Sequence, residues 1–193
     1  MRARCREVGA LMILDEIQTG MGRTGPWFAH LDYCFCPDII CLAKAYGGGL
    51  PLGAFVAPEH IMKVIQADPI LGHITTFGGN PVSCAASLGV FEALESSPEL
   101  MEGIPAKEQH ILDVLVHPSI EKISGKGLMY CLWLKPEIDS FAVIDRLEKE
   151  GLITNSFLFA ENAIRITPPL TITSEELDKG LKLILRVIEE LSA

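Results

Sequence analysis

Two residues with side chains suited to carbonyl chemistry each follow a short apolar run. Asp15 follows residues 9–14 (GALMIL), and Lys44 follows residues 39–43 (IICLA). A lysine amine that is withdrawn from water loses its proton readily and becomes a nucleophile towards carbonyl carbons. The glycines at 47–49 follow closely, and glycine lets the backbone approach a ligand. A carboxylate at one strand end and an amine at another therefore predict a shared reactive site.

This pair matches the demands of a site for pyridoxal phosphate. That cofactor needs a lysine that forms a Schiff base and an acidic group beside its ring nitrogen. Lys44 and Asp15 are the candidates for these two roles. Short motifs also arise by chance, so an ordinary surface lysine at a strand end is the alternative.

Composition argues against several classes of function. The chain has 193 residues, and 16 basic against 25 acidic side chains give a net charge of −9. Binding of nucleic acid or of an anionic membrane requires a cationic surface, so neither partner is expected. No apolar run approaches the roughly 20 residues that span a bilayer.

The six cysteines are best explained as reduced thiols of a cytoplasmic protein. None belongs to a CxxC pair, and Cys34 and Cys36 are too close together for the usual zinc spacing. His30 lies nearby and raises the alternative of a metal site, but the ligand spacing is missing. We therefore expect small buried side chains at these positions and no metal.

The elements that must position Asp15 and Lys44 form an α/β pattern. Short apolar strands are expected at 9–14, 38–43 and 53–57, separated by glycine-rich turns, which indicates a mixed or parallel sheet buried on both faces. Ligands bind at the carboxyl ends of strands in such sheets. Helices are expected over residues 58–67, 82–96 and 105–115.

The pattern changes near residue 118 to that of a small α+β unit. Strands are expected at 120–124, 128–134, 152–154 and 163–166. Helices are expected at 140–150, with Gly151 after the last turn, and at 175–191, with Thr173 and Ser174 before the first turn. We place the boundary between two domains, 1–96 and 97–193, at the end of the helix expected over 82–96.

Four segments, in this order, resemble the signature blocks of the class III aminotransferases: DEIQTGMGRTG (15–25), PDIICLAKAYGGGLPLGAF (37–55), TTFGGNP (75–81) and IRITPPLTIT (164–173). The family includes the acetylornithine, ornithine and 4-aminobutyrate transaminases. The resemblance implies an α/β fold of the fold-type I, pyridoxal-phosphate-dependent kind that is similar to aspartate aminotransferase. Residues 1–96 would be the rear part of the large cofactor domain and 97–193 the small C-terminal α+β domain.

The resemblance also implies a role for individual residues. Asp15 matches the partner of the cofactor's ring nitrogen, Gln18 the residue near its phenolic oxygen, and Lys44 the Schiff-base lysine. Thr76 matches the threonine that reaches the cofactor phosphate of the neighbouring subunit, which implies a homodimer. Arg165 matches the arginine that binds a substrate carboxylate. Each also has an ordinary alternative: a turn residue at Gln18, a loop cap at Thr76, a surface ion pair at Arg165.

The implied function is a transaminase that moves an amino group from an amino acid or ω-amine donor to a 2-oxo acid such as 2-oxoglutarate. Family members are about twice as long, and their front half supplies the phosphate loop and the aromatic residue that stacks on the cofactor. We therefore keep open a partial sequence, one chain of a split enzyme completed by a separate N-terminal chain, and a non-catalytic remnant that binds a partner. An isomerase of the glutamate-1-semialdehyde aminomutase type is a further alternative.

Overall fold

The computed structural model of this chain describes residues 1–67, 69–70 and 73–192. Its elements fall into two units, Met1–Pro98 and Glu99–Ala193. The sequence places the boundary between residues 96 and 97, within two residues of this division. The assignment of the two units to a cofactor domain and a small domain stays a prediction.

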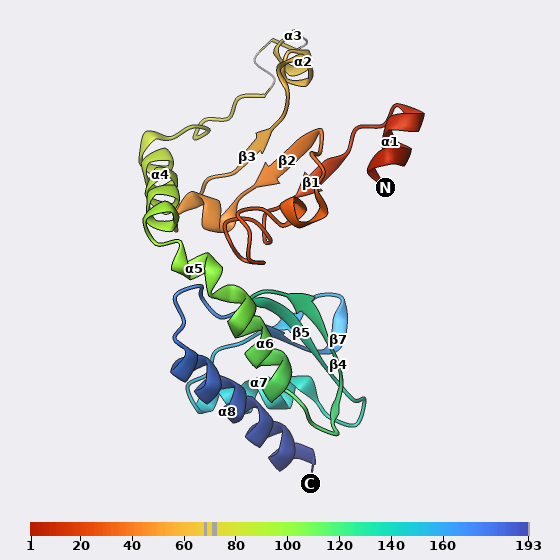
Figure 1. Cartoon of the computed structure of the whole chain (residues 1–193), viewed down its shortest axis with the longest axis vertical. Coiled ribbons are helices and arrows are strands. Elements are labelled where there is room, and N and C mark those ends of the chain that lie inside the picture. Colours follow the sequence, from red (N-terminus) through yellow and green to blue (C-terminus); the bar gives the residue numbers. More distant parts are fainter. Residues whose placement is uncertain (68, 71–72, 193) are drawn as a thin grey trace. The chain divides into compact units, whose positions relative to one another are not determined.

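The first unit combines three short strands with helices. Its elements are α1 (Arg2–Val8), β1 (Ile13–Asp15), the 3-10 helices η1 (Ala29–Tyr33) and η2 (Lys44–Gly47), β2 (Ile39–Leu42), β3 (Ala54–Val56), α2 (Glu59–Met62), α3 (Val64–Ala67) and α4 (Pro81–Ser96). The three expected strands are present (Figure 1). The helix expected at 58–67 is two short helices that are separated at Lys63, and α1 was not expected.

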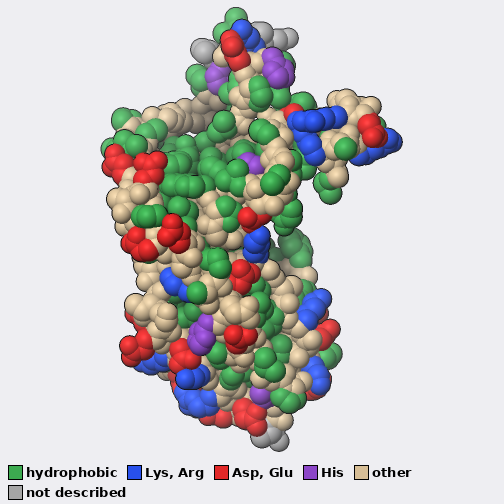
Figure 2. Space-filling model, viewed as in Figure 1, with side chains coloured by type: hydrophobic (Ala, Val, Ile, Leu, Met, Phe, Trp, Pro, Cys, Tyr) green, Lys and Arg blue, Asp and Glu red, His purple; other side chains and the backbone are tan. Residues whose placement is uncertain are grey.

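The sheet of the first unit is mixed, as the sequence predicts. Strands β1 and β2 are parallel, β2 and β3 are antiparallel, and the order is β1-β2-β3. The expectation that this sheet is buried on both faces is wrong for the chain as it stands. Ile13 is 60% exposed, Phe55 47% and Val56 57%. Figure 2 shows hydrophobic side chains gathered on the visible face of this unit. The apolar pattern signalled strands, but three strands supply too little structure to cover them.

Asp38 fastens the start of β2 to the segments that precede β1. Its carboxylate pairs with the guanidinium of Arg2, whose Nη2 donates to Oδ1 at 2.6 Å. The backbone N–H of Met12 donates to Oδ2 at 2.8 Å. The Arg2 hydrogen bonds lower the pKa of Asp38 to about 2, from an ordinary value of 3.8. The ionised carboxylate therefore helps to align β1 beside β2.

Asp38 should make the folded chain lose stability as the pH falls from about 4 towards 2. A depressed pKa means that the ionised carboxylate stabilises the folded state above its unfolded pKa, and that this contribution is lost as the pH falls through its folded pKa. Urea titrations at pH 6, 4 and 3 should show the decline, and Asp38→Asn should show a smaller one. An Asp38→Asn variant that declines as steeply as the parent would contradict this role.

Helix α4 begins with a defined cap. The side chain of Asn80 accepts hydrogen bonds from the backbone N–H groups of Val82 at 3.0 Å and Ser83 at 3.4 Å, and Pro81 occupies the first helical position. Asparagine before proline is a common way to start a helix, so the sequence signalled this end well. The helix contacts η2, the element that begins at Lys44.

The second unit is a four-stranded antiparallel sheet with helices on one face. Its elements are α5 (Glu99–Glu102), α6 (Ile104–Val114), β4 (Ile120–Lys126), β5 (Met129–Leu134), α7 (Ser140–Lys149), β6 (Ser156–Phe157), β7 (Ala160–Ile166) and α8 (Ser174–Ser192). The strand order is β4-β5-β7-β6. Most of the sequence expectations for this half are confirmed. The exception is the strand expected at 152–154, because pairing begins only at Ser156.

The core of the second unit lies between its sheet and the helices α6, α7 and α8. Burial alternates along β5, where Tyr130, Leu132 and Leu134 are buried and the residues between them are half-buried. Leu132 packs in one cluster with Ile111 from α6, with residues of α7 and α8, and with Ile164 of β7. The opposite face of the sheet bears Cys131, Trp133 and Arg165.

Helix α8 starts with a reciprocal cap that the sequence predicts. The backbone N–H of Glu176 donates to the hydroxyl of Thr173 at 3.2 Å, and the backbone N–H of Thr173 donates to the Glu176 carboxylate at 2.9 Å. These bonds lower the pKa of Glu176. No helix among the described residues is long and apolar enough to cross a membrane.

Candidate active site

Asp15 and Lys44 lie at the same edge of the first unit's sheet. Asp15 is the last residue of β1 and pairs in register with Cys41 of the parallel strand β2. Lys44 begins η2, two residues after β2 ends. The backbone N–H of Glu16 donates to the carbonyl of Cys41 at 3.0 Å and extends the pairing past Asp15. Because β1 and β2 are parallel neighbours, their carboxyl ends bring the two predicted residues together.

Both side chains are free to meet a ligand. Asp15 and Lys44 are exposed. Asp15 Oδ1 accepts the backbone N–H of Ile17 at 2.9 Å, and no described residue bonds its other oxygen. The Lys44 amine forms no hydrogen bond or ion pair with any residue that the structure describes. The sequence argument relied on a lysine amine withdrawn from water, whereas in this chain both side chains are exposed.

The backbone of Lys44 adopts an uncommon conformation. Its φ is 52°, in the left-handed region that side chains other than glycine rarely adopt. Residues around it are held by turn hydrogen bonds, from Tyr46 N to Ala43 O at 3.1 Å and from Gly48 N to Ala45 O at 3.0 Å. Strained backbone of this kind concentrates at functional sites, where the surrounding structure enforces it.

The structure gives a different reason for a glycine at position 48 from the one that the sequence suggested. A Cβ atom there would lie 2.5 Å from the carbonyl oxygen of Ala86 in α4, and its φ is +62°. The close approach that needs a glycine is therefore to α4, and the expectation that this glycine faces a ligand is wrong. Gly49, with no atom within 4 Å of such a Cβ, remains open.

Glu16 organises the loop that follows β1. Its side chain is 1% exposed, and its oxygens accept the backbone N–H groups of Ala29 at 3.1 Å and His30 at 2.9 Å. They also contact the Thr19 hydroxyl and His30 Nδ1. Burial alone would raise the pKa of Glu16, but these hydrogen bonds outweigh it and the pKa is lowered.

The loop between β1 and η1 carries Gln18, which is exposed. Glu16 ties both ends of this loop together through Thr19, Ala29 and His30. The sequence predicts a supporting role for Glu16, because it directly follows Asp15 and its side chain must point to the other face of the chain. The His30 ring lies in the same network, with Nδ1 3.1 Å from the Glu16 carboxylate.

Thr76 lies in the exposed turn before α4. No contact joins it to Asp15, Gln18 or Lys44 among the described residues. The structure therefore brings Asp15, Gln18 and Lys44 to one edge and leaves Thr76 apart from them. A threonine that serves a neighbouring subunit would have this freedom.

Arg165 belongs to β7 of the second unit. Its backbone N–H donates to the carbonyl of Asn155 at 2.8 Å, and its own carbonyl accepts the hydroxyl of Thr154. Its guanidinium carbon lies 4.9 Å from the ring centre of Phe157. Nε is buried without a hydrogen-bond partner, and no described carboxylate pairs with the charge. The alternative of a surface ion pair is therefore wrong within the described chain.

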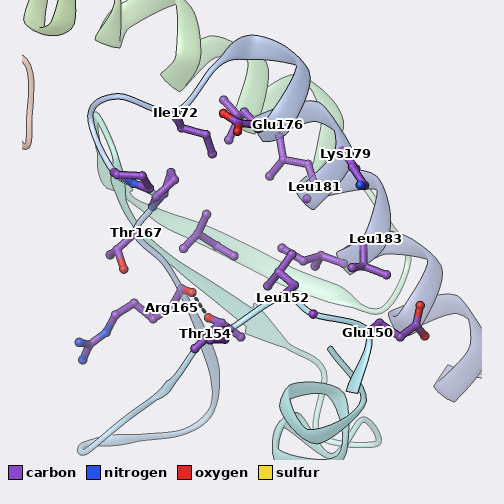
Figure 3. Close-up of a pocket in the computed structure, with 18 of the residues that line it drawn as sticks. Glu150, Leu152, Thr154, Arg165, Thr167, Ile172, Glu176, Lys179, Leu181 and Leu183 are labelled. Carbon is purple, nitrogen blue, oxygen red and sulfur yellow. Dashed lines mark hydrogen bonds between the residues drawn. The ribbon is translucent and has the colours of Figure 1, made fainter. Parts of the chain in front are cut away.

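A cavity of about 560 Å³ lies between α8 and residues 150–155. Figure 3 shows Leu152 and Leu181 among its apolar lining, while the side chain of Arg165 extends away from them. This cavity was not predicted from the sequence. Arg165 is among its lining residues, most of which are apolar.

Comparison with known proteins identifies the family of this chain. The profile of the family described as "Aminotransferase class-III" matches residues 1–188. The chain therefore belongs to the class III aminotransferase family. A putrescine aminotransferase of Pectobacterium atrosepticum is 40% identical over 199 aligned residues, which cover 100% of this chain and 42% of that protein. An acetylornithine aminotransferase of Caldanaerobacter subterraneus subsp. tengcongensis is 39% identical, over 99% of this chain and 48% of that protein.

Solved structures agree on the fold. An ornithine aminotransferase from Toxoplasma gondii, crystallised with partial occupancy of PLP at its active site, superposes with a TM-score of 0.88 at 30% identity. It aligns with 99% of this chain and 45% of its own. An (S)-enantioselective ω-transaminase from Thermomicrobium roseum gives a TM-score of 0.89 at 28% identity, over 100% and 46% of the two chains. The fold is that of the PLP-dependent aminotransferases, and the chain spans less than half the length of these relatives.

The residues present fit pyridoxal phosphate. Lys44 offers an amine with no partner in the described chain, and Asp15 offers a free carboxylate oxygen at the adjacent strand end. A cationic ring nitrogen and an aldehyde would satisfy both groups. Lys44 would hold the aldehyde carbon and Asp15 the ring nitrogen.

Proposed function

We propose that this chain is the C-terminal part of a pyridoxal-phosphate-dependent transaminase. The reaction would move an amino group from an amino acid or ω-amine donor to a 2-oxo acid such as 2-oxoglutarate. The observation that carries the proposal is the placement of Asp15 and Lys44 at the carboxyl ends of the adjacent parallel strands β1 and β2. The family match over residues 1–188 supports it.

Each residue has a defined part in this proposal. When bound, pyridoxal phosphate supplies an electron sink for the carbon that carries the amino group. Lys44 would move the proton of that carbon, as general base and then general acid. Asp15 would hold the ring nitrogen. Gln18 would lie near the phenolic oxygen, Arg165 would bind the substrate carboxylate, and Thr76 would reach the phosphate of a second subunit.

The amino donor is best sought among compounds with a terminal amine. Curated relatives act on putrescine and acetylornithine by name, and the solved neighbours include ornithine and ω-amine enzymes. The acceptor is a 2-oxo acid, because Arg165 is a free guanidinium suited to a carboxylate. Six free cysteines support a cytoplasmic setting.

The exposed apolar residues of β1 and β3 support a further polypeptide as partner. Such a surface is unfavourable in water and is typically covered by another chain or segment. We propose the remaining part of a class III aminotransferase for this role, joined to this chain or separate, within a homodimer. Without that polypeptide, this chain would be a non-catalytic remnant that can still bind a partner through the exposed apolar surface.

The test is glutamate formation from 2-oxoglutarate with a panel of putrescine, ornithine, acetylornithine and 4-aminobutyrate. The chain should be assayed alone and with a purified front half of a class III enzyme. Asp15→Asn should lower the rate about 100-fold, because loss of one preorganised charge typically costs that much. Glu59→Gln, in an exposed ion pair with Lys63, should not change it. Equal rates for Asp15→Asn and the parent would refute the proposal.

A further inference from the structure

Arg165 is a cation that has no counter-ion in the part of the chain that the structure describes. The guanidinium has no carboxylate partner among the described residues. Most other arginines of the described chain are paired: Arg2 with Asp38, Arg4 with Glu7, Arg146 with Glu150 and Arg186 with Glu150 and Glu190. In a chain of net charge −9, an unpaired arginine stands out.

The groups beside Arg165 explain why it stays unpaired. Cys131 is its partner across the strands. Burial raises the pKa of the Cys131 thiol, and the nearby charges of Lys122 and Arg165 lower it only in part, so the thiol stays neutral. On the other side lies the ring of Phe157 in β6, a residue for which the sequence predicted no role.

We propose that Phe157 is a positioning residue that orients Arg165 for the carboxylate of the substrate. The proposal rests on the transaminase function. A guanidinium stacked on an aromatic ring keeps its in-plane N–H groups free while its plane is fixed. A carboxylate binds an arginine best through two parallel N–H donors in that plane. Phe157 therefore sets the plane in which the carboxylate is received.

The backbone around the pair supports this role. Asn155, Thr154 and Arg165 are joined by two hydrogen bonds, from Arg165 N to Asn155 O and from the Thr154 hydroxyl to Arg165 O. Phe157 follows on β6, which pairs with β7 through Ser156 and Ile164. The arginine and the ring are thus held by a paired hairpin, so that their stacking is defined by the fold.

The test follows the Arg165 side chain by NMR of the chain labelled with ¹⁵N-arginine, with the signal assigned by its loss in Arg165→Lys. Phe157→Tyr keeps the ring and should keep the ring-current shift of the Arg165 Nε–H group. Phe157→Leu should lose it. Titration with 2-oxoglutarate should move the signal, with a Kd about two- to fivefold weaker for Phe157→Leu. Phe141→Leu, an exposed phenylalanine elsewhere in the unit, should match the parent.

The outcomes separate this inference from the proposed function. If Phe157→Leu keeps both the shift and the Kd while Arg165→Lys binds weakly, the role of Phe157 is refuted and that of Arg165 stands. If 2-oxoglutarate does not move the Arg165 signal of the parent, the carboxylate role of Arg165 and this inference both fail. Amino transfer itself is judged by the glutamate assay.

Discussion

Replacing Lys44 by alanine should abolish covalent attachment of pyridoxal phosphate to the chain. The Lys44 amine is exposed, unpaired in the described chain and held at the end of β2, so it is the group able to bond the cofactor's aldehyde. Borohydride reduction followed by digestion and mass spectrometry should find the pyridoxyl group on the Lys44 peptide of the parent. In an active assembly, the same substitution should lower the rate by about 100- to 10,000-fold, because we propose Lys44 as the group that also transfers the proton.

The matched control is Lys63→Ala, which removes the other lysine of the first unit. Lys63 is paired with Glu59 at 2.7 Å on an exposed helix and has no part in the site. This variant should keep the label on Lys44. Labelling that is spread over the surface lysines, and unchanged in Lys44→Ala, would show that the chain lacks the cofactor site.

Replacing Glu16 by alanine should destabilise the first unit by about 3 kcal/mol. The backbone N–H groups of Ala29 and His30 would lose their acceptor inside the protein, and each unsatisfied buried donor costs roughly 1–3 kcal/mol. The effect is largest near neutral pH, where the lowered pKa keeps this carboxylate ionised. Urea unfolding followed by Trp27 fluorescence measures it, in a background where Trp133→Phe silences the second unit.

Glu59→Ala is the control for this experiment. Its side chain is 81% exposed and makes only an ion pair within α2 and the adjoining turn, which is worth roughly 0–1 kcal/mol. A Glu16→Ala variant that unfolds at the same urea concentration as Glu59→Ala would mean that the loop does not depend on Glu16.

The strands and main helices could be predicted from the local sequence pattern, but the pairing and burial of their residues could not. Residues 39–43 predicted β2, and Thr173 with Glu176 predicted the start of α8, because apolar runs and caps act over a few residues. The strand expected at 152–154 failed because pairing depends on β7, which lies later in the chain. The prediction that Ile13 is buried was wrong for the same reason, because the elements that would cover this strand lie far away in the sequence.

The candidate site shows the same division. Asp15, Gln18, Lys44, Thr76 and Arg165 were predicted from ordered motifs, and the parallel pairing of β1 and β2 places Asp15 and Lys44 at the same edge of the sheet. The motifs placed Glu16 only beside the site, and they gave no prediction for Phe157. The importance of Glu16 and Phe157 lies in contacts with residues that are not their immediate neighbours, such as His30 and Arg165.

The sequence by itself determined the family, because membership depends on residue types in a fixed order, and it predicted the reactive groups and the division of the chain. Only the tertiary structure decided how each group is held. It turned Gly48 towards α4, buried Glu16 against His30 and left Arg165 with an aromatic ring in place of a carboxylate. Hydrogen bonds, steric contact and burial act through space, so residue order alone does not specify them.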